Sequence, residues 1–130
     1  MNKSAFSIKN YLEKPATAEE RLLDELLGSW LNGYRNHNAL KVIKLFSDKA
    51  TVRPIGIRKT VNKDEYTKLL LKYIKQIHRI SLEDVYFMMS GDGAFIYFIL
   101  NATTAFSLVS EQRYFKCLKQ DTRWQFTEFF

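Results

Sequence analysis

Residues 18–54, AEERLLDELLGSWLNGYRNHNALKVIKLFSDKATVRP, decide the fold. Apolar and aromatic residues recur at intervals of three and four, which places them on one face of a helix. They are Leu23, Leu26, Leu27, Trp30 and Tyr34. A helix with so broad an apolar stripe needs a partner surface. The strand-rich second half of the chain is the candidate for that surface.

Capping signals place the start of this helix. Thr17 and Glu20 form a capping box, in which each side chain accepts a hydrogen bond from the other residue's backbone amide. We expect the helix to run from Ala18 to about Asn36. Gly28 and Gly33 each weaken it by ~1 kcal/mol relative to alanine. That cost is tolerable only where packing demands a close approach.

Two shorter elements and a second long helix follow. Leu40, Ile43 and Phe46 predict a short apolar-faced helix, and residues 51–55 predict a strand. A helix is expected over residues 63–77, capped by Asn62. Its apolar stripe comprises Tyr66, Leu69, Leu70, Tyr73, Ile74 and Ile77.

The hydrophobic period then changes from helical to two, which is typical of strands. Strands are expected over residues 80–89, 94–101, 104–119 and 123–130, with turns at Ser90–Gly93 and Gln120–Thr122. Such hairpin connections predict an antiparallel meander. Helices followed by such a sheet predict an α+β fold, with the helices on one face of a curved antiparallel sheet.

Length and composition are those of one globular domain. The chain has 130 residues, of which 46% are hydrophobic and 15% aromatic, enough for a packed core. We assign residues 17–130 to this domain. Residues 1–16 are an N-terminal appendage that is expected to pack on the body or to cover an opening.

The net charge of +6 admits an anionic ligand, a nucleic-acid surface or simple solubility. Solubility is favoured and nucleic acid is disfavoured, because the basic residues are scattered among acids. The single cysteine, Cys117, indicates a buried thiol in a reducing compartment. No apolar run is long enough to span a membrane, so we expect no membrane partner and a cytoplasmic location.

Three motifs together resemble the nuclear transport factor 2-like superfamily, which includes SnoaL-like proteins and ketosteroid isomerases. They are Leu45–Val52 (LFSDKATV), Gly91–Ala94 (GDGA) and Lys119–Phe126 (KQDTRWQF). The resemblance covers residues 18–130. It implies a cone-shaped α+β barrel, cystatin-like in architecture, in which the sheet wraps around the long N-terminal helix. It also implies a pocket at one end and a homodimer joined through the outer sheet face.

The catalytic groups of the ketosteroid isomerases do not carry over to this chain. The tyrosine that donates a hydrogen bond to the oxyanion aligns with Trp30. The aspartate that acts as general base aligns with Arg53, beside Pro54. Their protonated aspartate aligns with Arg113, or with Gln112 after a one-residue slip. Because that reaction needs a carboxylate base and an oxyanion donor pair, we do not expect ketosteroid isomerase activity.

The candidate site is a pocket lined by aromatic residues and two arginines. Its expected members are Trp30, Tyr34, Arg53, Tyr66, Tyr73, Tyr97 and Arg113. The arginines would suit a carboxylate or phosphate, since a guanidinium forks onto such groups. The alternative is that the aromatic residues are core and the arginines face solvent. One step of strand register decides where Arg113 points.

Other catalytic chemistry has little support in the sequence. His37 and His78 lie far apart and without a partner carboxylate at motif spacing, and no glycine-rich phosphate loop occurs. We therefore expect no metal and no cofactor. Glu111 is expected to approach Arg113 on one strand face as an ion pair.

Two functional hypotheses of different class remain. The favoured one is a non-catalytic homodimeric module that binds a small apolar or anionic ligand, or a protein partner. The alternative is a SnoaL-like isomerase, cyclase, dehydratase or hydrolase that uses Tyr34, Arg53 or Arg113. In the last strand, Trp124, Phe126, Glu128 and Phe130 share a face by alternation. Such an aromatic face is expected to be covered by a second copy.

Overall fold

The computed structural model describes residues 17–130, so the expected appendage of residues 1–16 lies outside the described residues. The described part is an α+β structure with a curved, unclosed sheet. Its helical elements are α2 (Ala18–Arg35), α3 (Ala39–Ile43), α4 (Lys63–Tyr73) and the 3-10 turn η1 (Ile74–Gln76). Its strands are β1 (Phe46–Val52), β2 (Val61–Asn62), β3 (Ile77–Ser90), β4 (Gly93–Thr104), β5 (Leu108–Gln120) and β6 (Arg123–Phe129).

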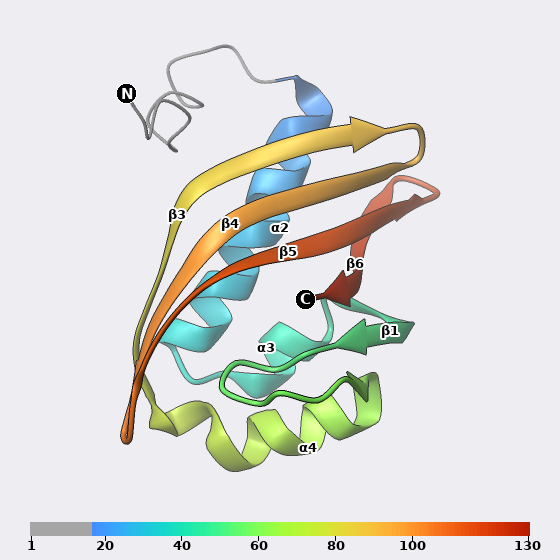
Figure 1. The fold of residues 1–130 in the computed structure, drawn as a ribbon. Coiled ribbons are helices and arrows are strands. Elements are labelled where there is room, and N and C mark those ends of the chain that lie inside the picture. Colours follow the sequence, from blue (N-terminus) through green and yellow to red (C-terminus); the bar gives the residue numbers. More distant parts are fainter. Residues whose placement is uncertain (1–16) are drawn as a thin grey trace.

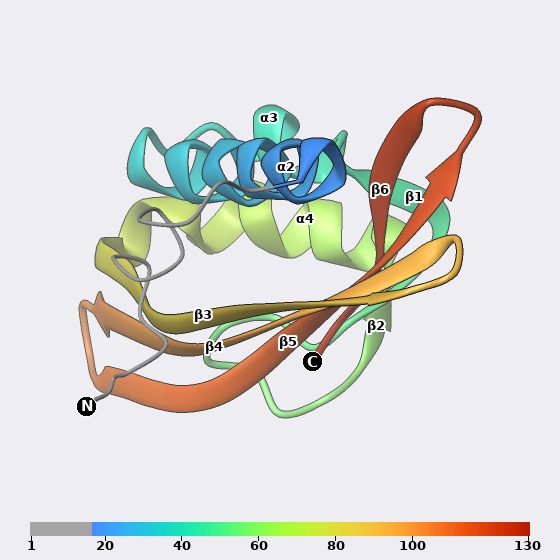
Figure 2. The same ribbon diagram turned by 90° about the horizontal axis from the view of Figure 1, so that it is seen from above.

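The six strands form one sheet in the order β2-β1-β6-β5-β4-β3 (Figure 1). Neighbouring strands from β6 to β3 are antiparallel, which confirms the predicted meander, whereas β1 pairs with β6 in parallel. Seen from above, the helices lie together on one side of the curved sheet (Figure 2). The pocket expected from the sequence would lie between these helices and the concave sheet face.

The long helix α2 forms for the predicted reasons. The Thr17 hydroxyl accepts from the Glu20 amide at 3.1 Å, and Glu20 Oε1 accepts from the Thr17 amide at 3.2 Å. The stripe points to the sheet, since Leu23 and Trp30 are fully buried. Trp30 lies with its ring centroid 5.1 Å from that of Phe115 and 5.3 Å from that of Phe129, so it anchors α2 to β5 and β6.

Several boundaries differ from those expected. Phe46 begins β1 rather than ending the second helix, so α3 is only one short turn. Leu40 is 64% exposed and is not part of its buried face. The strand expected over residues 51–55 runs instead over Phe46–Val52. The helix expected over residues 63–77 tightens to a 3-10 turn after Tyr73, because Ile77 already pairs with Thr104 in the sheet.

The face of the last strand was assigned wrongly by simple alternation. Cys117 lies opposite Phe126, while the next pair is Lys116 with Glu128, so Thr127 is an inserted residue in a β-bulge. The bulge turns Phe129 to the same side as Phe126, and both are fully buried, with Trp124 only 7% exposed. These aromatic residues are therefore the core and not an outer surface.

Among the described residues, no helix is both long and apolar enough to cross a bilayer.

Candidate functional site

A pair of tyrosines occupies the interior between α2, α4 and the sheet. The Tyr34 and Tyr66 hydroxyls are 2.6 Å apart, and the two residues are 1% and 0% exposed. Tyr34 comes from the last turns of α2, four residues after Trp30, and Tyr66 comes from the first turn of α4, after the Asn62 cap. The two helix patterns thus bring together two hydroxyls that lie 32 residues apart in sequence.

Burial raises the pKa of Tyr34 and that of Tyr66 above the ordinary value of 10.0, because a phenolate would lose its hydration. Both hydroxyls are therefore neutral at physiological pH, and one donates to the other. Beside them, the buried Trp30 indole N–H makes no well-formed hydrogen bond among the described residues, but it contacts the Tyr66 hydroxyl, and that contact opposes the rise in the pKa of Tyr66. A buried donor without any partner would cost on the order of 1–3 kcal/mol, and the contact with Tyr66 reduces that cost for Trp30.

A small pocket leads to the tyrosines from the α4 side. Its volume is about 30 Å³, which suits a water molecule or two rather than an organic ligand. It is lined by Tyr34, Pro54, Ile55, Ile57, Tyr66, Leu69, Leu70, Tyr73, Ile74 and Ile77. The rest of the cone interior is filled by aromatic rings, with Phe115 stacked on Phe126 and Phe129 at centroid distances of 3.9 Å and 4.7 Å.

Arg113 lies on the concave face and is 2% exposed. Its Nη1 donates to Glu111 Oε1 at 2.8 Å, its Nε donates to the Phe130 main-chain oxygen at 2.6 Å, and its Nη2 donates to the Arg53 carbonyl. The guanidinium also lies 4.2 Å from the centre of the Phe129 ring. Burial lowers the pKa of Arg113, and the hydrogen bond to Glu111 opposes that shift. All three nitrogens of the guanidinium are thus bound by the protein itself.

Arg53 lies at the edge of the same cluster. Its Nη2 donates to the Phe130 main-chain oxygen at 3.0 Å, and its Nη1 lies 3.9 Å from Glu111 Oε1. The two arginines therefore converge, but on a carboxylate and main-chain oxygens of this chain. The expected Glu111–Arg113 pair is confirmed, with the difference that its arginine is buried rather than on the surface.

The seven predicted pocket residues fall in four places. Trp30, Tyr34 and Tyr66 meet in the interior, and Arg53 and Arg113 meet at Glu111. Tyr73 is 39% exposed at the mouth of the small pocket. Tyr97 is on the other side of the sheet, 36% exposed, and does not reach the pocket.

Tyr97 belongs to an aromatic cluster that spans β3, β4 and β5 on the outer face. Its ring centroid lies 6.2 Å from Tyr86, 5.9 Å from Phe95 and 5.9 Å from Tyr114. Phe130 extends the cluster with a centroid 5.8 Å from that of Tyr114. We call these five residues the outer aromatic cluster. Of this cluster, the expected pocket includes only Tyr97. Phe95 and Tyr97 alternate with Ile96 and Phe98, a pattern that puts aromatic or aliphatic groups on both faces of β4.

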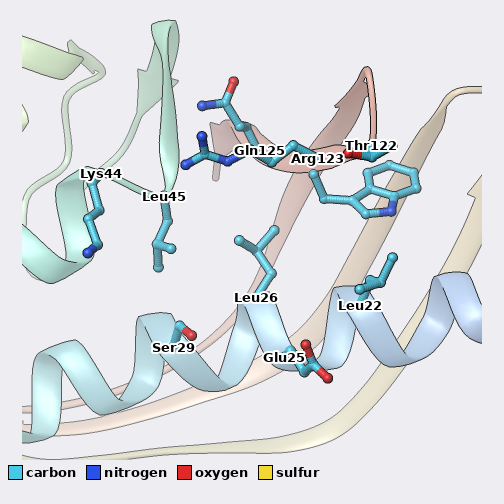
Figure 3. Close-up of a pocket in the computed structure, with 10 residues that line it drawn as sticks. Leu22, Glu25, Leu26, Ser29, Lys44, Leu45, Thr122, Arg123 and Gln125 are labelled. Carbon is cyan, nitrogen blue, oxygen red and sulfur yellow. The ribbon is translucent and has the colours of Figure 1, made fainter.

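A second depression lies between α2 and the β5–β6 hairpin (Figure 3). Its volume is about 240 Å³, and Leu22 and Leu26 of α2 lie on one wall with Arg123 and Thr122 on the other. Trp124 closes its end, with the indole N–H donating to Glu19 Oε2 at 2.9 Å. Its lining mixes charged, polar and apolar side chains, and among residues 17–130 no buried unpartnered donor faces it.

Within residues 17–130, no three histidine, cysteine, aspartate or glutamate side chains gather where they could hold a metal ion.

Comparison with known structures supports the fold directly. A nuclear transport factor 2-like protein of unknown function from Pseudomonas putida KT2440 superposes with a TM-score of 0.75 at 15% identity, covering 89% of this chain and 87% of that chain. A ketosteroid isomerase-like protein from Erwinia carotovora atroseptica SCRI1043 gives 0.66 at 20% identity, covering 88% and 95%. A candidate scytalone dehydratase from Novosphingobium aromaticivorans DSM 12444 gives 0.66 at 16% identity, covering 85% and 80%.

The chain therefore has the nuclear transport factor 2-like fold, as its three motifs predict. No protein-family model matches the sequence, and no curated protein matches it closely. At these identities the similarity defines the fold alone, so function has to be argued from the residues of this chain.

Proposed function

We propose that this chain is a non-catalytic protein-association module that forms a homodimer through the outer face of its sheet. The observation that carries the proposal is the outer aromatic cluster, in which Tyr86, Phe95, Tyr97, Tyr114 and Phe130 form a continuous aromatic surface. Tyr86 is 44% exposed and the adjoining Met88 is 39% exposed. Aromatic residues and methionine are enriched at the centres of protein interfaces.

The interior supports association over catalysis. A small-molecule site normally encloses several hundred cubic ångströms, whereas the pocket above the tyrosines encloses about 30 Å³. No carboxylate lines that pocket in the described chain, and the raised pKa values of Tyr34 and Tyr66 keep both groups protonated. General-base chemistry needs a group that can accept a proton near neutral pH. The chain's own groups also occupy Arg113, which removes it as an anion receptor.

Sedimentation velocity tests the proposal. We expect the wild-type protein to sediment as a dimer, and Tyr97→Glu and Tyr86→Glu to sediment as monomers, because a charge would be buried in the interface. Leu71→Glu is the matched control, since Leu71 is 64% exposed on α4, away from the sheet face. Circular dichroism confirms that each variant folds. A wild-type monomer, or dimers in all variants, would refute the proposed interface.

The Trp30 indole N–H, which makes only a weak contact with Tyr66, favours a second candidate. This candidate is a small neutral ligand with one oxygen acceptor bound beside the tyrosine pair. Such a ligand would need Tyr73 and the segment around Ile57 to move outward, since both line the present pocket. Nuclear magnetic resonance titration with phenol, and with benzene as the matched compound without oxygen, tests this. Shifts at Trp30, Tyr34 and Tyr66 with phenol alone would support the site, and equal shifts with both compounds would refute the polar contact.

A further inference from the structure

The tip of the β4–β5 hairpin carries the two most exposed large hydrophobic side chains of the described chain. Phe106 is 86% exposed and Leu108 is 82% exposed. The turn that presents them is tightly bonded. Thr104 donates its amide to the Ser107 carbonyl at 2.8 Å, and its hydroxyl oxygen accepts from the Phe106 and Ser107 amides at 3.2 Å and 3.0 Å. The fold thus holds these apolar groups in water at a defined protrusion.

The hairpin tip lies beside a group of exposed basic residues. The Ala105 amide donates to the Gln76 carbonyl at 3.1 Å, and Arg79 pairs with Thr103 in the sheet, so η1 and the start of β3 flank the tip (Figure 1). On the other side, Arg58 and Leu108 line one surface depression. The exposed basic residues in these flanking segments are Arg58, Lys59, Lys72, Lys75 and Arg79. We call this surface, with Phe106 and Leu108, the basic tip.

Basic residues outnumber acidic ones around the basic tip. Within residues 53–84 and 101–111 the acids are Asp64, Glu65, Glu83, Asp84 and Glu111. Glu83 Oε1 accepts from the Asn101 side-chain amide, so that carboxylate is already bound within the sheet. Asp64 and Glu65 lie in the first turn of α4, at the opposite end of that helix from Lys72. Glu111 is already bound to Arg113. These two stretches hold eight lysines and arginines against five acids, so this end of the molecule has a net positive surface around two apolar side chains.

We propose that the basic tip is a peripheral docking site for a bilayer that contains anionic phospholipid. Phe106 and Leu108 would enter the headgroup–acyl boundary, and the surrounding lysines and arginines would lie against the negatively charged headgroups. Apolar insertion combined with attraction of basic residues is the usual basis of reversible membrane binding. The expectation of no membrane partner rested on the lack of a spanning segment, which a peripheral contact does not need.

The shape and chemistry of the tip favour a membrane over other anionic partners. A nucleic acid would bind the basic residues and could stack on Phe106, but it would leave Leu108 in water. A protein interface usually centres on a well-packed pocket or a broad complementary surface, whereas Phe106 and Leu108 project from a convex turn. A fluid bilayer accommodates both side chains without a complementary pocket.

Co-sedimentation of the full chain with vesicles tests the proposal. We expect binding to vesicles of phosphatidylcholine mixed with phosphatidylglycerol, and binding at least about tenfold weaker to phosphatidylcholine alone. Phe106→Ser should weaken binding to the mixed vesicles about tenfold, since it removes a large apolar group from the inserted tip. Arg58→Gln should weaken it about fivefold. High salt should weaken the charge-dependent part.

Matched controls lie at the other end of β5, where Leu118 is about 33 Å along the strand from Leu108. Leu118→Ser removes an apolar group that is 40% exposed, and Arg123→Gln removes one positive charge from the exposed β5–β6 hairpin. Both should leave vesicle binding within about twofold of wild type, because neither touches the basic tip. The pair of controls separates insertion of the tip from a general effect of hydrophobicity or net charge.

A direct readout comes from Phe106→Cys labelled with an environment-sensitive fluorophore. Cys117 is fully buried, so the label reports the tip alone, and its emission should shift to the blue on anionic vesicles. Three results would overturn the proposal. The first is no binding to mixed vesicles at low salt. The second is an equal loss of vesicle binding in the tip and control variants. The third is that Phe106→Ser loses self-association or single-stranded RNA binding while the wild-type protein binds no vesicles.

Discussion

Arg113 is the residue whose substitution should cost the most outside the hydrophobic core. Its side chain is fully buried, and it binds Glu111 and two main-chain oxygens. Arg113→Met should lower the free energy of unfolding by about 2–3 kcal/mol, because it removes three hydrogen bonds of a buried charged group. The Arg53 carbonyl loses its donor, while Glu111 and the Phe130 oxygen keep only Arg53. Arg53→Met should cost about 1 kcal/mol or less, because that side chain is 32% exposed and its ion pair is weak. Urea unfolding measures both, and equal losses would contradict the assignment.

The buried thiol of Cys117 should make the free energy of unfolding depend on pH. Burial raises the pKa of its thiol from 9.0 to about 12. A group with a raised folded-state pKa contributes its full stabilising effect below its unfolded pKa and loses it as pH rises. The contribution of Cys117 should therefore fall between pH 9.0 and about 12, by at most about 1.4 kcal/mol per pH unit. The difference in unfolding free energy between wild type and Cys117→Ala measures it, and a difference that stays constant across that range would refute the prediction.

Residue patterns predicted which side chains are buried better than they predicted which face of a strand each side chain lies on. Trp30, Tyr34 and Tyr66 follow from helical spacing, and Glu111 with Arg113 follows from two-residue spacing on a strand. Tyr97 was assigned to the interior because both faces of β4 carry large apolar groups, so alternation cannot identify the inner face. The burial of Arg113 was not predictable either, since Phe129 and the oxygens that satisfy it come from other strands.

At the scale of elements, the two glycines of α2 should behave oppositely. A methyl group at Gly33 would approach Val42 Cγ2 to 2.5 Å, whereas one at Gly28 would meet nothing within 4 Å. The predicted close approach is thus confirmed at Gly33, between α2 and α3, and wrong at Gly28. Gly28→Ala should raise the free energy of unfolding by up to about 1 kcal/mol, and Gly33→Ala should lower it by about 1–3 kcal/mol. Thermal and urea unfolding of the two variants test this, and the same sign for both would refute it.

The sequence predicted where helices and strands occur, but their boundaries depend on the strands with which they pair. One capping box, the Asn62 cap and the turns identified α2, α4 and the meander, because those signals are local. The strand β2 was missed because its two residues form only by pairing with Thr51 and Val52. The bulge at Thr127 was also invisible to alternation, and it reversed the assignment of the outer face of β6. Both features are set by neighbouring strands rather than by their own residues.

At the scale of the whole molecule, the outer aromatic cluster and the basic tip lie on different parts of the surface. The cluster centres on Tyr97 and Tyr114 in the middle of the sheet, and the tip lies at the β4–β5 turn. The interior between them is a single core that includes Trp30, Phe115 and Phe129. Because the core is filled, contacts of this protein with other molecules are expected on its surface rather than inside its cone.

A dimer joined through the outer aromatic cluster predicts that stability depends on protein concentration. Association stabilises the folded state by mass action, so the thermal midpoint of the wild-type protein should rise as its concentration increases. Tyr97→Glu should abolish that dependence, whereas Phe106→Ser should keep it, because Phe106 lies at the hairpin tip outside the cluster. Differential scanning calorimetry over a range of concentrations measures all three proteins. A wild-type midpoint that does not change would contradict the dimer, and a loss of dependence in Phe106→Ser would move the interface from the sheet face to the basic tip.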